Sequence, residues 1–268
     1  MKLKFCSLSS GSSGNCYYLG NEFHGILIDA GISAGAIRKF LKTMDISFES
    51  IVGVLVTHNH SDHIKGLEVL TRNIAIPIYT TQNIWESIIS SPTQHKITDN
   101  RFQNINLHQN LHLAGFDIEA FPVFHDAPET IGFHIKYKTH KITIVTDLGH
   151  ICDTAASYIK AANFLVIESN YDEQMLQTSS YPYFLKERIF SNNGHLSNDQ
   201  TSTFIADYFP KEISHICLAH LSKNNNSPEK AFQTLQQTLI NKGIPQNKQP
   251  KIVVLNRISP TEIIHLGN

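Results

Sequence analysis

The stretch Thr57-His58-Asn59-His60-Ser61-Asp62-His63 decides how this chain is interpreted. It follows the apolar run of residues 51–56, which predicts a buried strand. Side chains two positions apart at a strand end point the same way, so His58 and His60 face one direction. Asp62 and His63 then lie in a turn before a helix-like stretch. A histidine-rich polar loop could contain a chance pair, but the full array of imidazoles and a carboxylate favours a metal-binding loop.

Composition describes an ordinary globular protein and excludes few classes of function. The chain has 268 residues, of which 41% are hydrophobic and 17% charged, enough to bury a core. Lys and Arg total 22 against 23 Asp and Glu, a formal net charge of -1. This balance argues against a protein wrapped wholesale in nucleic acid. It leaves room for a local basic groove, and bound cations would add positive charge.

The cysteines and the apolar runs predict the compartment. The four Cys form no C-x-x-C pair and lie in or near apolar segments, so we expect reduced, mostly buried thiols. The first residues contain no apolar signal core, and no apolar run approaches the roughly 20 residues that a membrane span needs. We expect a cytoplasmic enzyme that does not enter the membrane.

The order of predicted elements indicates one domain over residues 1–268. Strands dominate the first half and alternate with helices in the second, without a linker or repeat. Two sheets packed face to face with helices outside would satisfy this order. Strands are predicted at residues 2–8, 16–20, 25–29, 51–57, 121–124, 130–137, 141–147, 164–168, 213–219 and 251–256. Helices are predicted at residues 36–44, 64–71, 81–89, 153–162, 183–190, 199–208 and 228–240.

Five landmarks at predicted strand ends carry a resemblance to a known superfamily. They are Asp29, the loop 58–63, His125, Asp147 and His220, in that order along the chain. With these landmarks the chain resembles the metallo-β-lactamase superfamily of metal-dependent hydrolases. The resemblance implies an α/β (α+β) fold, a four-layer αβ/βα sandwich of two facing mixed sheets with outer helices and a metal site at one edge.

The resemblance also implies two divalent metal ions, Zn²⁺ or Mn²⁺, with Fe as a further option. One ion would be held by His58, His60 and His125, the other by Asp62, His63 and His220, and Asp147 would bridge them. Two ions about 3.5–4 Å apart can share a hydroxide that acts as the nucleophile. Asp29 is expected to orient a ligand rather than bind an ion. Alternatively, it caps its strand by bonding the turn at Gly31.

Departures within the superfamily narrow the expected reaction. Asp147 stands where lactam-cleaving members carry Cys, and the residues after His125 differ from those of glyoxalase II. The chain looks more like the phosphodiesterase branch. Glu168 and His195 resemble the Glu and His that ribonuclease Z places beside its metals, so we expect a catalytic role for both, together with Asp62. His195 would protonate the leaving group. Alternatively, it packs in a loop where Ser197 or Asn198 caps the next helix.

Spacing indicates a compact member of the superfamily. Only 22 positions separate His125 from Asp147 and 73 separate Asp147 from His220, which leaves no room for a tRNA-gripping arm or an added nucleic-acid domain. The segments 7–16, 27–31, 168–172, 194–198 and 220–226 are most similar to the YycJ (WalJ) family. That resemblance implies a 5′–3′ exonuclease acting on DNA. A small-molecule or cyclic-nucleotide phosphodiesterase using the same site is the alternative, and a metal-binding regulatory module without catalysis is a third class.

Two polar loops are candidates for substrate binding. Ser12 and Asn15 belong to a Ser/Gly loop that either cradles an anion or makes a tight turn between strands. Lys223 and Asn224 either grip a phosphate or precede the helix that starts near residue 228. DNA is the expected partner, and the sequence leaves a homo-oligomer open. No aromatic-plus-basic cluster suggests a platform for single strands.

Overall fold

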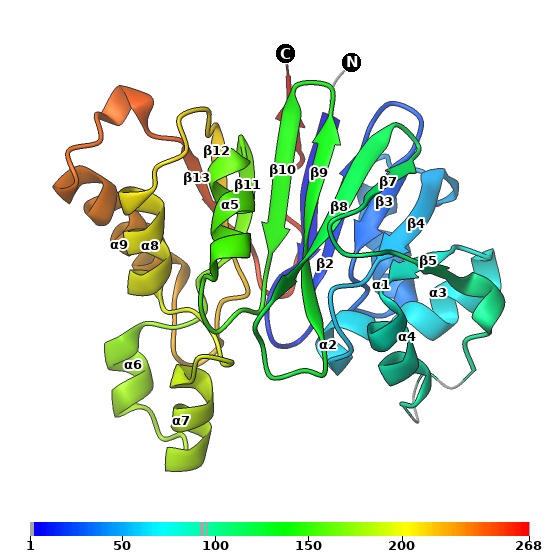
Figure 1. The fold of residues 1–268 in the computed structure, drawn as a ribbon, viewed down its shortest axis with the longest axis horizontal. Helices are drawn as coiled ribbons and strands as arrows, with labels where there is room; N and C mark the ends of the chain where they lie inside the picture. Colours follow the sequence, from blue (N-terminus) through cyan, green and yellow to red (C-terminus); the bar gives the residue numbers. More distant parts are fainter. Residues whose placement is uncertain (1–2, 92–93, 95, 268) are drawn as a thin grey trace. The chain divides into compact units, whose positions relative to one another are not determined.

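The computed structural model describes residues 3–91, 94 and 96–267. Within this part of the chain the strands form two seven-stranded sheets, accompanied by helices (Figure 1). The strand order is β14-β1-β2-β3-β4-β5-β6 in the first sheet and β13-β12-β11-β10-β9-β8-β7 in the second. Both contain parallel and antiparallel pairs, so the predicted pair of mixed sheets with helices is confirmed.

The elements have the following bounds. The strands are β1 (Leu3–Ser9), β2 (Cys16–Gly20), β3 (Gly25–Ile28), β4 (Ile51–Leu55), β5 (Ile78–Thr80), β6 (Phe102–Asn104), β7 (Asn110–Leu113), β8 (Phe116–Val123), β9 (Thr130–Tyr137), β10 (His140–Val145), β11 (Phe164–Glu168), β12 (His215–Ala219), β13 (Lys251–Val254) and β14 (Ile264–Leu266). The α-helices are α1 (Ala34–Thr43), α2 (Ser61–Ile64), α3 (Leu67–Ile74), α4 (Gln82–Ile89), α5 (Asp153–Ala161), α6 (Glu173–Thr178), α7 (Tyr183–Phe190), α8 (Asn198–Asp207) and α9 (Pro228–Asn241).

The chain divides into two compact units. One comprises Met1–Ala120, Ala127–Thr130 and Asn256–Asn268, and the other comprises Phe121–Asp126 and Ile131–Leu255. The single domain over residues 1–268 stays a prediction. Across the described residues, no helix is both long and apolar enough to cross a bilayer.

The first sheet places the loop at residues 58–63 at the carboxyl end of a parallel pair. Strands β1, β2 and β3 run antiparallel, whereas β3, β4, β5 and β6 run parallel. Ile28 pairs with Leu55, so the chain leaves β3 and β4 at the same edge of the sheet. β1 also pairs with β14, which brings Leu3 opposite Leu266. Buried parallel strands tolerate continuous apolar runs, which explains the composition of β3 and β4.

The second sheet repeats this arrangement. The strands predicted at 130–137 and 141–147 form an antiparallel hairpin, β9 and β10, with Lys138 at a φ of 54° in the turn. Strands β10, β11, β12 and β13 then run parallel. Val145 pairs with Ile167, and Glu168 pairs with Ala219. The residues that follow β10 and β12 therefore emerge at the same edge as Glu168.

The predicted helix at residues 64–71 is wrong in its continuity. The chain forms α2 and α3 instead, and it breaks near Gly66. The Gly66 N–H donates to the Ala30 carbonyl at 2.7 Å, and a Cβ at this position would lie 2.3 Å from the Ile32 carbonyl oxygen. This close approach of two backbones explains the break, because only glycine fits there.

The cysteines match the expectation of reduced, largely buried thiols. Cys6, Cys16, Cys152 and Cys217 are free, and all but the half-buried Cys152 are buried. Burial raises the pKa of the Cys6 thiol to about 12, so this group stays protonated at neutral pH.

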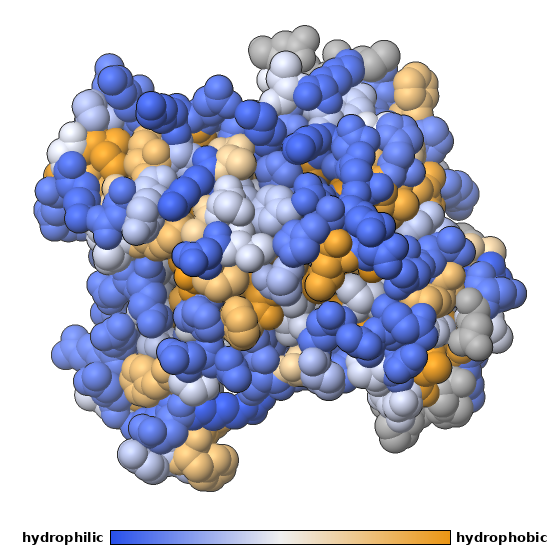
Figure 2. Space-filling view, viewed as in Figure 1, coloured by the Kyte–Doolittle hydropathy of each residue, from blue (hydrophilic) through white to orange (hydrophobic). Residues whose placement is uncertain are grey.

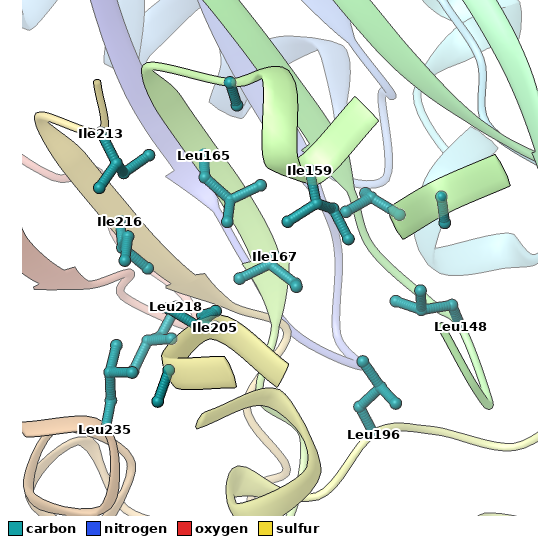
Figure 3. Close-up of a cluster of buried hydrophobic side chains, with 14 of the residues drawn as sticks. Leu148, Ile159, Leu165, Ile167, Leu196, Ile205, Ile213, Ile216, Leu218 and Leu235 are labelled. Carbon is teal, nitrogen blue, oxygen red and sulfur yellow. The ribbon is translucent and has the colours of Figure 1, made fainter. Parts of the chain in front are cut away.

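The core of the second unit packs helices against β11 and β12. Hydrophilic side chains cover most of the face shown in Figure 2, and apolar ones form small separate groups. Figure 3 shows the buried cluster itself, in which Leu165 and Ile167 of β11 lie beside Ile216 and Leu218 of β12. Residues two apart on a strand share a face, and here that face meets side chains of α5, α8 and α9. This packing fixes β11, which ends at Glu168, and β12, which is followed by His220.

Replacing Ile216, which is fully buried in this cluster, tests its contribution to stability. Ile216→Ala removes packed methyl groups and leaves a cavity, so we expect the free energy of unfolding to fall by about 2–5 kcal/mol. Denaturant unfolding followed by circular dichroism measures the loss. Ile240→Ala is the matched control, because Ile240 lies on α9 with 53% of its surface exposed. A loss below about 1 kcal/mol for Ile216→Ala would contradict the packing shown in Figure 3.

Candidate metal centre

Three histidine rings of the first unit cluster at the carboxyl end of β4. The ring centroids of His58 and His60 are 4.7 Å apart, and those of His58 and His63 are 4.0 Å apart. His63 Nε2 lies 3.6 Å from Asp62 Oδ2. Two ligand atoms bound at about 2.0–2.2 Å to one tetrahedral ion stand roughly 3.4 Å apart. The spacing of His63 and Asp62 therefore fits a shared cation.

Asp29 is fully buried and holds His63 directly and His58 through Thr57. Its carboxylate accepts from His63 Nδ1–H at 2.7 Å and from the backbone and hydroxyl of Thr57, both at 2.8 Å. Since the Thr57 hydroxyl gives its proton to Asp29, its oxygen accepts from His58 Nδ1–H at 3.0 Å. Both neutral rings then carry their lone pair on Nε2, the arrangement found in carboxylate–histidine–metal groups.

Strained backbone marks three of the predicted site residues. Asp29, Asp147 and His220 have φ values of 59°, 54° and 55°, in the left-handed region that residues other than glycine rarely occupy. Each follows the end of a strand, where the chain turns sharply. Such conformations cost about 1–3 kcal/mol each and persist only where the surroundings impose them.

The Ser/Gly loop packs against the metal loop of the first unit. Asn15 is fully buried, and its side-chain amide nitrogen lies 3.2 Å from Asp62 Oδ2 and 2.9 Å from His63 Nε2. A Cβ on Gly31, in the turn after β3, would lie 1.6 Å from the Asp62 carbonyl oxygen and 2.6 Å from the Asn15 backbone nitrogen, so this turn packs tightly against both loops. Asn15 thus positions predicted ligands.

The anion cradle finds less support than the tight turn in this loop. The N–H groups of Gly11, Gly14 and Asn15 already donate to protein acceptors. Ser12 is exposed, as a substrate contact requires. The roles of Ser12 and Asn15 in substrate binding stay predictions.

Glu168 organises the predicted residues of the second unit. Its carboxylate is fully buried and accepts from His195 Nδ1–H at 2.7 Å and from His220 Nδ1–H at 3.0 Å. The backbone N–H groups of Leu148 and Leu196 donate to its other oxygen, both at 3.1 Å. Glu168 therefore fixes two rings and two loops at once.

The charges of this pair shift both of their pKa values. Burial alone would raise the pKa of Glu168, but the charge and hydrogen bond of His195, with the bond from His220, lower it overall. Burial likewise would lower the pKa of His195, whereas the charge and hydrogen bond of Glu168 raise it. The pair thus favours a carboxylate beside an imidazolium.

Asp147 joins these rings. Its Oδ1 lies 2.9 Å from His220 Nδ1 and 3.9 Å from His125 Nε2. Together with Glu168 and His195, it and His220 offer ligand atoms within 4.8 Å of one another. His125 donates from Nδ1 to the Gly194 carbonyl at 2.9 Å, which leaves Nε2 as the lone-pair nitrogen.

The loop around His195 has the cap that the structural alternative expects, and the catalytic role of His195 stays a prediction. Ser197 caps α8 through a capping box with Gln200, as the structural alternative expects. Asn198 lies inside the helix and bonds Ser169 and Asn226. The His195 ring nevertheless contacts Glu168 and keeps 20% of its side chain exposed.

One acidic residue at this site, Asp126, is absent from the site residues predicted from sequence. Asp126 Oδ1 lies 3.0 Å from His125 Nε2, and its other oxygen forms an ion pair with Arg188. Sixty-two positions separate Asp126 from Arg188, so no local motif announces the pair. The Asp that directly follows His125 was the available signal.

The second loop predicted to bind substrate lies on the surface of the second unit. Lys223 and Asn224 are exposed, and Asn224 Nδ2 donates to the Tyr181 hydroxyl at 3.1 Å. The helix that follows begins at Pro228 with Ser227 as its cap, so the two residues lie in the loop before it. Their role in substrate binding stays a prediction.

Asp29→Asn tests whether the buried carboxylate orients metal ligands. An amide presents one acceptor instead of two, so the bond to His63 or to Thr57 is lost and metal affinity should fall about 10- to 100-fold. Competition with a chelating dye measures this affinity. Asp45→Asn is the matched control, because Asp45 also has a left-handed φ of 53° but is exposed. Equal affinity in wild type and Asp29→Asn would refute the role.

Comparison with known proteins identifies the family. The family model described as "Beta-lactamase superfamily domain" matches residues 24–216. The chain is 36% identical to Exodeoxyribonuclease YycJ of Bacillus anthracis over 267 residues, which cover 98% of this chain and 99% of the relative. It is 33% identical to Exodeoxyribonuclease WalJ of Streptococcus pneumoniae over 236 residues, or 88% of each chain.

A solved structure agrees in fold. The metallo-β-lactamase fold protein YhfI from Bacillus subtilis superposes with a TM-score of 0.72 at 14% identity, covering 99% of this chain and 100% of that one. At this identity the likeness shows the fold alone. The matched domain and the near full-length relatives together show that the chain belongs to the metallo-β-lactamase superfamily of hydrolases and, within it, to the family that contains YycJ and WalJ.

Proposed function

We propose that this chain is a metal-dependent phosphodiesterase that degrades DNA as an exodeoxyribonuclease. The observation that carries the proposal is the Glu168 carboxylate that holds His195 and His220 through their Nδ1 atoms. Hydrolysis of a phosphodiester needs a positioned acid for the leaving oxygen, and a carboxylate-held histidine supplies one. The names of the YycJ and WalJ relatives support DNA as the substrate.

Divalent metal ions are part of the proposal, and the donor set fits them. His58, His63, His125 and His220 each have Nδ1 within hydrogen-bond distance of an oxygen, which presents Nε2 as the ligand atom. We propose two ions, Zn²⁺ or Mn²⁺ with Fe as a third option, bound by the seven ligands predicted from sequence. When bound, such ions polarise the phosphate and lower the pKa of a water ligand to about 7.

His195 acts on the leaving group in this proposal. Its Nδ1–H donates to Glu168, and the carboxylate stabilises the ring when it carries a second proton on Nε2. The side chain is 20% exposed, so the ring is accessible to a substrate, whereas Glu168 is fully buried. His195 is therefore the proton donor, and Glu168 positions it.

The substrate class is tested with end-labelled DNA. We expect duplex DNA labelled at its 3′ end to be shortened from the 5′ end, and bis-p-nitrophenyl phosphate to be a much poorer substrate. Degradation from the 3′ end would overturn the expected polarity. Turnover of bis-p-nitrophenyl phosphate or a cyclic nucleotide without any attack on DNA would replace the nuclease by the small-molecule alternative.

Asp62→Ala should abolish turnover of DNA. The change removes a carboxylate that lies 3.6 Å from His63 Nε2 and is predicted to bind an ion. Release of labelled nucleotides measures activity, and metal analysis by mass spectrometry measures the ions per chain. A variant that retained wild-type turnover would exclude Asp62 from the site.

His195→Ala should slow turnover by about 10²–10⁴-fold while the metal content stays near that of wild type. The change removes the proton donor and leaves the seven predicted metal ligands intact. His215→Ala is the matched control, because His215 lies at the start of β12, the opposite end of the strand from His220. Full activity in His195→Ala would refute its role as the acid.

A further inference from the structure

Helix α7 of the second unit is poorly covered by the rest of the protein. Of its eight residues, all of them described, none is buried. Tyr183 is 77% exposed and Phe184 is 73% exposed. Figure 2 shows apolar side chains over the region where Figure 1 places α6 and α7. Tyr183 and Phe184 are consecutive residues of one helix, and large apolar side chains left exposed in this way are candidates for a binding surface.

The carboxyl end of α7 is nevertheless fixed to the catalytic loop. The His195 N–H donates to the Ile189 carbonyl at 3.1 Å, and a Cβ on Gly194 would lie 2.2 Å from the same oxygen. Arg188 of α7 pairs with Asp126, the neighbour of His125. The carboxyl end of α7 is thus hydrogen-bonded to the loop that carries the proposed acid, His195.

The amino end of α7 is joined to the loop that follows His220. The Tyr181 hydroxyl, two residues before Tyr183, accepts from Asn224 Nδ2 at 3.1 Å. Lys223, next to Asn224, is exposed. Lys186 Nζ donates to the Gln177 carbonyl at 2.7 Å, which ties α7 to α6. The loop that carries the exposed Lys223 is therefore hydrogen-bonded to the residues just before Tyr183 and Phe184.

The length of α7 suits a short run of nucleotides. Six positions separate Tyr183 from Ile189, or about 9 Å along the helix. Successive nucleotides of one strand rise by about 3.4 Å, so this distance spans roughly two to three of them. Bases that begin two or three positions from the scissile bond would lie near the aromatic pair.

We propose that Tyr183 and Phe184 stack on unpaired bases of a DNA strand whose terminal phosphodiester enters the active site, while Lys223 contacts its phosphates. The proposal rests on the proposed nuclease function and names the form of DNA that this site holds. Exposed aromatic rings on α7 and an exposed cation on the loop bonded to its amino end match the bases and phosphates of a single strand. Paired bases in a duplex have both faces covered, so the strand must be unpaired at this surface.

A binding assay tests the proposal. The probe is a fluorescein-labelled oligothymidylate with cleavage-resistant phosphorothioate linkages, and anisotropy with the metal-loaded enzyme measures the dissociation constant. We expect Tyr183→Ala/Phe184→Ala to weaken binding about 5- to 150-fold for each stacked base, the equivalent of about 1–3 kcal/mol. Phe23→Ala is the matched control, because Phe23 is 68% exposed in the turn before β3, at the opposite end of that strand from Asp29.

An abasic probe separates stacking from other effects. We expect wild type to bind the abasic strand about as weakly as the double variant binds oligothymidylate, and the double variant to bind both probes alike. Lys223→Ala should weaken binding of both probes and reduce the dependence on salt by about one charge. Unfolding temperature and metal content check that the variants remain folded.

Three results would overturn the proposal. The first is wild-type affinity in the double variant. The second is that the double substitution weakens binding of the abasic probe as much as binding of oligothymidylate. The third is that wild type sediments as a dimer and the double variant as a monomer, which would make this surface a contact between copies. Failure of the proposed function looks different: wild type would then hydrolyse bis-p-nitrophenyl phosphate without binding or degrading any DNA. If wild type degrades DNA and the double variant does so equally well, only the stacking surface is refuted.

Discussion

The buried carboxylate of Glu168 is the group on which the arrangement of His195 and His220 in the second unit depends. An ion of this kind removed from water costs several kcal/mol unless donors surround it. The donors come from His195, His220 and the amides of Leu148 and Leu196, which lie on loops after three different elements. The need to satisfy one carboxylate therefore holds the ends of β10 and β12 and the loop before α8 in register. Asp29 imposes the same constraint on Thr57 and His63 in the first unit.

Many of the strands and the polar residues at their ends could be predicted, because both depend on short patterns of neighbouring residues. Apolar runs that end in a polar residue announce both a buried strand and its functional end, as at Asp29, His58 and Asp147. The carboxyl ends of parallel strands share an edge, which brings residues far apart in sequence together within each unit. The family motif then supplied roles that spacing alone leaves open. β2, β11 and α7 begin and end at their predicted residues, because turn-forming residues lie directly before and after each of them.

The features that escaped prediction depend on contacts between distant segments. Gly66 breaks a helical pattern because the backbone of residues 30–32 passes beside it, and that neighbour is invisible in a local window. The ion pair of Asp126 with Arg188 and the burial of Asn15 have the same origin. Tyr183 and Phe184 look like core residues in a sequence, because aromatic side chains are usually buried. Only their position on a helix with no covering layer reveals that they face solvent.

The pairing of β1 with β14 has a consequence for how the protein folds during synthesis. Leu3 finds Leu266 only after nearly the whole described chain has been made. Until then β1 is the outer strand of its sheet, with an unpaired row of backbone groups that could recruit a strand from another nascent molecule. Such a contact between remote segments also slows folding, because a long loop must close first. Residues 131–255 of the second unit, by contrast, are consecutive in the sequence. They can therefore begin to fold together before the last residues of the chain are synthesised.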